Sequence, residues 1–136
     1  MTEPTWLERR DALALHERLV ARFGGTSGIR DLSLLDSALA RPKHLHIYDA
    51  KADLFDLAAA YASGVIRGHP FVDGNKRTGF VLATLFLDLN GEQFAASEEA
   101  AARIVLDFAA GQIADDGLAA FLRESCESAS RSTGCA

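Results

Sequence analysis

A short run of polar and flexible residues, Arg67 to Gly79, lies between two strongly apolar stretches of the 136-residue chain. It reads RGHPFVDGNKRTG and supplies an imidazole at His69, a carboxylate at Asp73 and a permissive backbone at Gly74. Three further polar residues follow where a helix is expected to begin: Asn75, Lys76 and Arg77. Polar groups placed between apolar helices are costly to desolvate, so this run is the candidate site.

The expected helix start at Asn75 is suited to binding phosphate. The first turn of a helix has unpaired N–H groups and a partial positive charge, and both attract anions. Gly74 lacks a Cβ atom, so the backbone there can curl around an anion. Lys76 and Arg77 in the first turn oppose the helix dipole, and a bound polyphosphate would reverse that penalty. The pattern therefore predicts a nucleotide phosphate site.

Two further residues of the run complete a set for phosphoryl transfer. Asp73 could hold Mg²⁺ shared with the phosphates, because Mg²⁺ prefers one or two carboxylates together with ligand oxygens and water. The imidazole of His69 could accept the proton of a hydroxyl that attacks phosphorus. Since phosphoryl transfer needs mainly positioning and charge stabilisation, these groups would suffice for it.

Taken singly, the same residue types have ordinary structural explanations. A histidine beside proline is most often a surface or capping residue, Asp-Gly is a turn, Asn is a common N-cap, and Lys-Arg is a solvated pair. Phe71 anchors the loop under either interpretation. Arg67 could reach ATP or a target, or it could be only a cation at a helix end. The concentration of all these types in nine residues favours the chemical interpretation.

The whole chain has the composition of one folded domain. Hydrophobic residues make up 49% and charged residues 24%, with Ala and Leu favouring helix. The formal net charge of −5 and the scattered basic residues argue against direct nucleic-acid binding. Charges throughout the first helical stretch indicate neither a secretory signal nor a membrane span, so we expect a cytoplasmic protein. Cys126 and Cys135 are then expected to be thiols.

Apolar periodicity predicts an all-α fold, a compact bundle of about six helices. The helix after the candidate site is apolar almost all round from Phe80 to Leu89 and belongs at the centre. Pro42 should end the second helix, and the alternating residues 43–50, KHLHIYDA, predict a short flap or hairpin. Residues 1–127 form the predicted domain, with a flexible tail at 128–136. The expected helices cover residues 4–23, 31–42, 52–67, 75–89, 97–110 and 115 onward.

Three histidines lie outside the run. His16 falls on the apolar side of the first helix, where a partly buried, hydrogen-bonded histidine is the expected interpretation, so it is left out of the site. His44 and His46 form a His-x-His pair that could bind metal, but no third ligand accompanies them at a recognisable spacing. The predicted flap that carries the pair could instead lie along a target peptide.

The segment HPFVDGNKR resembles the signature of the Fic/Doc family, whose core is His-x-Phe-x-(Asp/Glu/Ala)-(Gly/Ala)-Asn-x-Arg. Residues Leu13 to Pro42 resemble the N-terminal region of death-on-curing toxins, and FLDLNG, Phe86 to Gly91, resembles the end of their central helix. The similarity therefore spans roughly residues 7–122. It implies a catalytic base at His69, a Mg²⁺ ligand at Asp73 and a nucleotide phosphate site at Gly74, Asn75 and Arg77.

Two positions separate the subtypes of this family. The AMP-transferring form of the motif has Gly where this chain has Lys76 and a second Arg where it has Phe80. Lys at the first position resembles the Doc subtype, which transfers the γ-phosphate of ATP to a threonine of elongation factor Tu and halts translation. The resemblance therefore favours a Mg²⁺-dependent protein kinase over an AMP transferase. A catalytically silent module that binds a partner is a third hypothesis.

The resemblance also implies how the protein is controlled. Many AMP-transferring relatives carry a built-in inhibitory helix marked (Ser/Thr)-x-x-x-Glu-(Gly/Asn). No Glu of this chain is followed by Gly or Asn. Restraint is therefore expected from a separate antitoxin whose C-terminal segment docks as a helix in an apolar groove.

Overall fold

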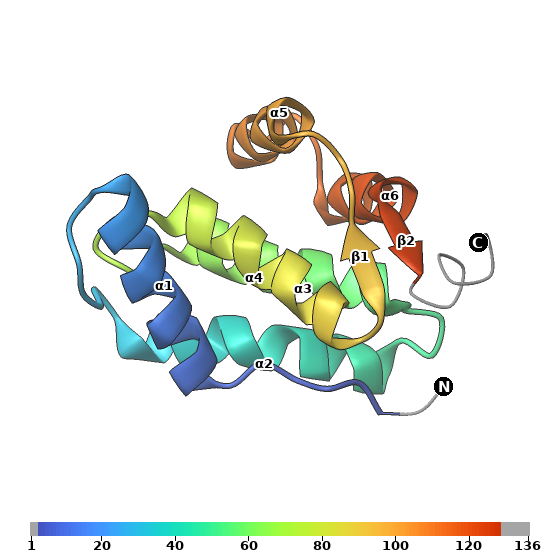
Figure 1. The fold of residues 1–136 in the computed structure, drawn as a ribbon. Helices are drawn as coiled ribbons and strands as arrows, with labels where there is room; N and C mark the ends of the chain where they lie inside the picture. Colours follow the sequence, from blue (N-terminus) through green and yellow to red (C-terminus); the bar gives the residue numbers. More distant parts are fainter. Residues whose placement is uncertain (1–2, 129–136) are drawn as a thin grey trace.

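Six helices and one short two-stranded sheet make up residues 3–128, the part of the chain that this computed structural model describes (Figure 1). The predicted all-α class and the predicted number of helices are confirmed. The elements are α1 (Arg9–Phe23), α2 (Leu32–Tyr48), α3 (Leu54–Gly68), α4 (Asn75–Leu89), β1 (Glu92–Phe94), α5 (Glu98–Ala109), α6 (Asp115–Ser125) and β2 (Cys126–Ser128). Within residues 3–128, no helix is both long enough and apolar enough to cross a lipid bilayer.

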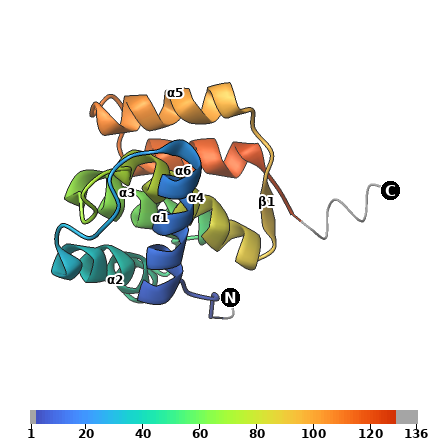
Figure 2. The same cartoon turned by 60° about the vertical axis from the view of Figure 1, so that its left-hand side comes forward.

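Helices α3 and α4 lie side by side at the centre of the molecule, with α2 on one side of them and α6 and then α5 on the other (Figure 2). Glycines let the central helices approach closely. A Cβ atom on Gly79 of α4 would lie 2.8 Å from Cγ1 of Ile66 in α3. A Cβ atom on Gly64 of α3 would lie 2.7 Å from Cβ of Ala38 in α2. The predicted central position of the apolar helix α4 is thus confirmed, and α3 shares it.

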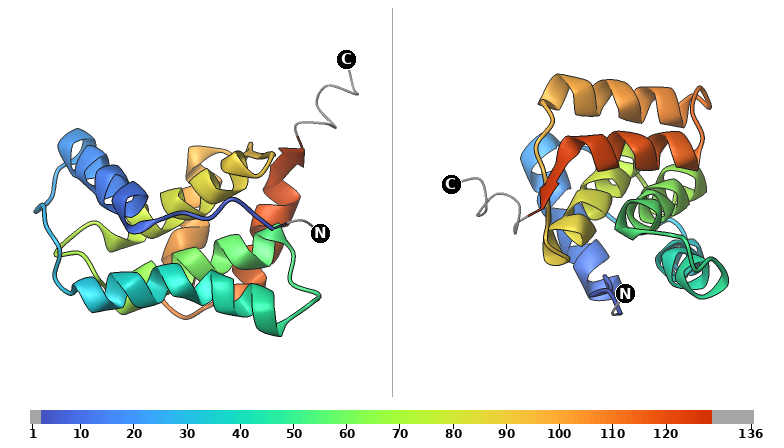
Figure 3. Two further views of the ribbon diagram at one scale, coloured as in Figure 1. Left: turned by 90° about the horizontal axis from the view of Figure 1, so that it is seen from below. Right: turned by 90° about the vertical axis from the view of Figure 1, so that its right-hand side faces the viewer.

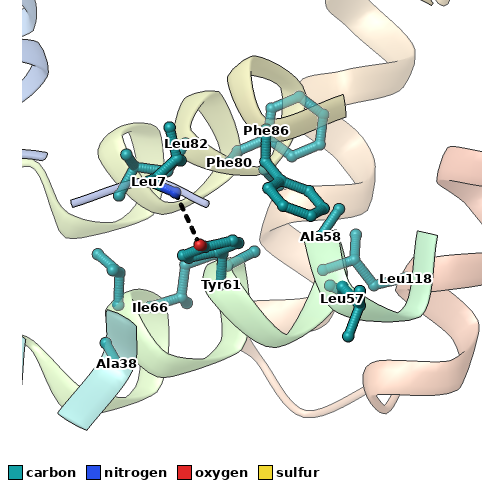
Figure 4. Close-up of a cluster of buried hydrophobic side chains, with 14 of the residues drawn as sticks. Leu7, Ala38, Leu57, Ala58, Tyr61, Ile66, Phe80, Leu82, Phe86 and Leu118 are labelled. Atoms are coloured by element: carbon teal, nitrogen blue, oxygen red, sulfur yellow. Dashed lines mark hydrogen bonds between the residues drawn. The ribbon is translucent and has the colours of Figure 1, made fainter. Parts of the chain in front are cut away.

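The core between these helices includes one buried hydrogen bond. The hydroxyl of Tyr61 accepts a hydrogen bond from the N–H of Leu7 at 3.0 Å, beside Phe86 (Figure 4). Both Tyr61 and Leu7 are fully buried. Burial raises the pKa of Tyr61 to about 12, because the ionised phenolate would lose its hydration.

The first helix begins at Arg9, so the prediction that it starts near Pro4 is wrong. The segment before it is extended and uses its backbone groups in tertiary contacts. The N–H of Thr5 donates to Oδ1 of Asn90 at 2.8 Å, and Nδ2 of Asn90 donates back to the carbonyl of Thr5 at 3.1 Å. Because Asn90, the C-cap of α4, satisfies these groups, a helical turn at this end would gain little.

The flap or hairpin predicted for residues 43–50 is also wrong, because α2 continues through Pro42 to Tyr48 (Figure 3). Proline inside a helix costs roughly 3 kcal/mol. Here Pro42 is buried on the same face as Leu35, Ala38 and Leu39, and this face packs along α3. The packing outweighs the lost backbone hydrogen bond.

The His-x-His pair of the predicted flap therefore lies on a helix. Two residues two positions apart on a helix point in nearly opposite directions, so His44 and His46 cannot share one metal ion. The ring of His46 lies edge-on to Trp6, with centroids 5.5 Å apart, and its Nε2 lies 3.6 Å from the carboxylate of Glu3.

The C-terminal elements follow the predicted order with two differences. Ser97 caps α5 as predicted, with Oγ accepting from the N–H of Ala100 at 3.1 Å. Helix α6 is preceded by Ala114 at the N-cap, and Asp115 is its first residue rather than its cap. The antiparallel pair β1 and β2, which the sequence did not predict, joins Phe94 to Cys126. Apart from Ser128, which ends β2, the predicted tail and Cys135 lie outside the described residues.

Candidate active site

The candidate site occupies the motif loop, residues 69–74, which joins the end of α3 to the start of α4. The loop begins and ends with a left-handed residue. His69 caps α3 with φ 54° and ψ 54°, and within residues 3–128 it is the one non-glycine residue with positive φ. Gly74 has φ 74° and is the N-cap of α4. Strained backbone at a non-glycine residue is frequent at functional sites and persists only where neighbouring contacts hold it.

Asn75 closes the loop with a reciprocal pair of hydrogen bonds. Its Oδ1 accepts from the N–H of Phe71, and its Nδ2 donates to the carbonyl of Phe71, both at 3.0 Å. The side chains of both residues are buried, as expected for Phe71 if it anchors the loop. The side chain of Asn75 thus holds the loop, and its N–H, in the first turn of α4, is the group left for an anion.

His16 is a residue of this site that sequence reasoning missed. The residue is only 2% exposed, and its Nε2 lies 2.8 Å from the carbonyl oxygen of Asp73. Its ring is stacked on Phe71, with centroids 3.9 Å apart. The predicted burial and hydrogen bonding are confirmed, but the partner is the motif loop. A histidine on the apolar face of α1 was the only sequence signal, and it did not indicate which segment the ring would meet.

The loop between α1 and α2, residues 24–31, supports the motif loop from the other side. The N–H of Val72 donates to the carbonyl of Gly28 at 3.0 Å, and the N–H of Asp31 donates to the carbonyl of Pro70 at 3.0 Å. Arg30 donates from Nε to the carbonyl of His69 at 2.7 Å. Sequence reasoning did not single out Arg30, because these contacts join residues about 40 positions apart.

The carboxylate of Asp73 is exposed and held by backbone donors. The N–H of Thr26 donates to Oδ2 at 3.2 Å, and that of Gly74 donates to Oδ1 at 2.9 Å. These hydrogen bonds lower the pKa of Asp73, so the group stays ionised at neutral pH. Each oxygen retains a lone pair that could face a cation.

The donor set fits a magnesium ion shared with a nucleotide better than a metal held by protein alone. Within residues 3–128, no group of three or more His, Cys, Asp or Glu side chains could hold a metal ion. Mg²⁺ accepts one protein carboxylate when phosphate oxygens and water complete its octahedron. Asp73, beside the first turn of α4, meets that requirement.

An open hollow of about 340 Å³ brings the predicted site residues together. It is lined by His69, Val72, Asp73, Gly74, Asn75, Lys76 and Arg77. The guanidinium of Arg77 lies 4.2 Å from the ring centroid of Phe23, a cation–π contact that fixes its direction. Arg67 points elsewhere, because its guanidinium lies over the ring of Phe108 in α5 at 4.3 Å.

The orientation of the His69 ring suits a proton acceptor. Its Nδ1 lies 3.3 Å from the carbonyl oxygen of Arg67. A carbonyl only accepts hydrogen bonds, so the proton of the neutral ring resides on Nδ1 in this contact. Nε2 is then left with a lone pair. The hollow thus combines a base with an ionised carboxylate, a helix start and two cations.

Comparison with known proteins identifies a family and two relatives. Residues 6–87 match the model of the Fic/DOC family. The chain is 44% identical over 97 residues to a protein named Toxin Doc from Mycolicibacterium smegmatis, covering 71% of each chain. It is 35% identical over 113 residues to a protein named Protein kinase doc from Escherichia phage P1, covering 83% of this chain and 89% of the relative.

Proposed function

The chain belongs to the Fic/Doc family, and on that premise we propose that it is a death-on-curing toxin that transfers the γ-phosphate of ATP to a hydroxyl of a protein target. One observation carries the proposal. An ionised carboxylate, a left-handed glycine and two cations surround the start of α4, in the same hollow as His69, whose Nδ1 faces the carbonyl of Arg67. The printed names of the relatives, a toxin and a protein kinase, support it.

The start of α4 would bind the phosphates of ATP. The N–H groups of its first turn precede the first helical hydrogen bond, which Thr78 donates to the carbonyl of Gly74 at 2.9 Å. Lys76 and Arg77 would add charge to these amides. Asp73 would hold Mg²⁺, which supplies charge neutralisation and orientation to the phosphates.

His69 would act as the general base. As the oxygen of a serine or threonine forms its bond to the γ-phosphorus, the hydroxyl proton passes to Nε2 of His69. The bond between the γ-phosphorus and the bridging oxygen breaks, and its electron pair stays on ADP. The contact of Nδ1 with the carbonyl of Arg67 stabilises the imidazolium that results.

Transfer of phosphate is favoured over transfer of AMP by the environment of Phe80. This residue stands where the AMP-transferring motif has its second arginine. Its side chain is buried and meets the ring of Phe94 edge-on, with centroids 5.4 Å apart. Phe80 therefore supplies no positive charge to a bound nucleotide. The charges near the phosphates would come from Lys76 and Arg77.

By resemblance to the Doc subtype, the proposed target is a threonine of elongation factor Tu, and the proposed restraint is a separate antitoxin protein. The acidic chain, with a net charge of −5, carries no basic tract that would favour nucleic acid as the target. Inhibition of translation in the cytoplasm would be the cellular effect.

Labelling with two forms of ATP tests the proposal. Purified protein is incubated with Mg²⁺, elongation factor Tu and ATP labelled at either the γ- or the α-phosphate. The expected result is label on the target from γ-labelled ATP only, growth arrest on expression, and loss of both in His69→Ala. His44→Ala, an exposed histidine on α2, is the matched control and should remain active.

The other hypotheses predict different outcomes. Label from α-labelled ATP alone would indicate AMP transfer. Normal growth with no label from either nucleotide would leave the partner-binding module as the remaining hypothesis.

A further inference from the structure

Arg30 contacts three successive carbonyl groups around the proposed catalytic base. Its Nε donates to the carbonyl of His69 at 2.7 Å, and its Nη2 donates to the carbonyl of Gly68 at 3.0 Å. Its backbone N–H donates to the carbonyl of Pro70 at 2.8 Å. One residue of the α1–α2 loop therefore holds the chain on both sides of His69.

These contacts fix the backbone of His69 rather than its ring. The carbonyl of Gly68 belongs to the peptide plane before the Cα of His69, and the carbonyl of His69 belongs to the plane after it. The two planes define φ and ψ of His69, since the peptide units are rigid. A guanidinium bonded to both carbonyls thus sets the direction in which the side chain leaves the backbone.

The contacts also offset two local costs. His69 is left-handed, which is unfavourable for a residue with a Cβ atom. The last carbonyls of α3 have no helical donor and carry the negative end of the helix dipole. A cationic donor at this end is favourable on both counts. Without Arg30, the turn at His69 would have less to hold it in its strained conformation.

We propose that Arg30 is a positioning residue that aims the imidazole of His69 at the hydroxyl to be phosphorylated, an inference that rests on the proposed function of this site. Arg30 does not line the hollow, so it acts through His69. The opposite end of the motif loop is held separately, by His16 at Asp73 and by Asn75 at Phe71. Nucleotide binding should therefore depend little on Arg30.

A lysine at position 30 should perform only part of the positioning role of Arg30. The planar fork of arginine presents two parallel donors to two acceptors, whereas an ammonium group is a single charge on a flexible stem. An ammonium group could hold one of the two carbonyls and leave the other peptide plane free to rotate. Arg30→Lys should thus lie between the wild type and Arg30→Ala.

The experiment measures kcat and KM for ATP in the full-length wild type, Arg30→Lys and Arg30→Ala. Arg30→Ala should lower kcat about 10- to 100-fold, the range expected for a misplaced reacting group, with KM for ATP within about twofold of the wild type. Arg9 is the matched control, because it is an exposed arginine that binds Asp36 with Nε at 3.0 Å and Nη2 at 2.7 Å. Arg9→Ala should leave kcat unchanged.

A readout independent of activity accompanies the kinetics. The backbone NMR resonances of His69 should shift in Arg30→Ala, while the amide of Phe71, held by Asn75, should not. Unchanged His69 resonances, or a kcat of Arg30→Ala equal to that of an active wild type, would overturn the inference alone. A wild type without transfer activity would overturn the proposed function and, with it, this role for Arg30. Should Arg30→Ala fail to fold, Arg30→Lys decides by the same criteria.

Discussion

Nε2 of His16 lies 2.8 Å from the backbone oxygen of Asp73, and the imidazole ring of His16 is stacked on the phenyl ring of Phe71. Since a carbonyl oxygen only accepts, Nε2 of His16 must carry a proton. A buried histidine of α1 thus acts as a hydrogen-bond donor to the loop that holds the proposed magnesium ligand. The first helix therefore supports the candidate site through His16.

Replacing His16 by phenylalanine should keep the stacking on Phe71 and remove the donor to Asp73. The carbonyl of Asp73 would lose its buried partner, so the unfolding free energy should fall by about 1–3 kcal/mol. The affinity for Mg²⁺ and ATP should fall as well, because the turn at Asp73 is no longer fixed. Urea denaturation and calorimetric titration measure the two effects. A His16→Phe protein as stable and as tightly binding as the wild type would contradict the prediction.

Replacing Asp73 by asparagine should abolish the magnesium dependence of ATP binding. The amide is close in shape to the carboxylate and keeps one acceptor oxygen, but it carries no charge for a divalent cation. We expect the affinity for ATP with Mg²⁺ to fall at least about tenfold, roughly 1.4 kcal/mol, as measured by calorimetry. Asp116→Asn is the control, because Asp116 is an exposed carboxylate that also accepts from the next N–H, that of Gly117, at 2.8 Å. An equal loss in both variants would refute a metal-binding role of Asp73.

Replacing Tyr61 by phenylalanine should alter the dependence of stability on pH. At neutral pH the variant should be less stable by about 1–3 kcal/mol, because the N–H of Leu7 loses its acceptor. The pKa of Tyr61 is raised from its ordinary value near 10 to about 12. The stability that the protonated hydroxyl of Tyr61 contributes is thus fully present below pH 10. It is lost as the pH rises toward 12, because the hydroxyl ionises at a lower pH in the unfolded chain than in the folded one.

The wild type should therefore lose up to about 3 kcal/mol more than Tyr61→Phe between pH 10 and pH 12, as two pKa units imply. Urea denaturation at several pH values measures how the difference in unfolding free energy between the two proteins narrows. Parallel curves for the two proteins would show that Tyr61 ionises equally readily in the folded and unfolded chains.

Local sequence signals predicted most of the helices because their causes are local. The apolar periodicity of α4 and its C-terminal Asn90-Gly91 gave the bounds Asn75–Leu89, and Ser97 gave the start of α5. The signals failed where distant packing decides the conformation. Pro42 is a helix breaker by itself, but its burial against α3 keeps α2 intact.

The residues of the candidate site also divide into those that local sequence signals identified and those that distant contacts place. The motif supplied the residues that line the hollow, because they are contiguous in the chain and share one turn. His16 and Arg30 were missed because each meets the motif loop through contacts that span roughly 40 to 60 positions. No local pattern distinguishes a histidine that supports a loop from one that fills a core.

The absence of a side chain at Gly79 has a consequence for catalysis. His69 caps the end of α3 and the proposed phosphate-binding turn begins α4, so each helix carries one half of the proposed site. The gap between them is set where Gly79 meets Ile66 and the carbonyl of Ala62, which a Cβ atom would approach to 2.8 Å and 3.1 Å. A single methyl group there would push the two helices apart and so lengthen the distance from His69 to the phosphates in the proposed reaction.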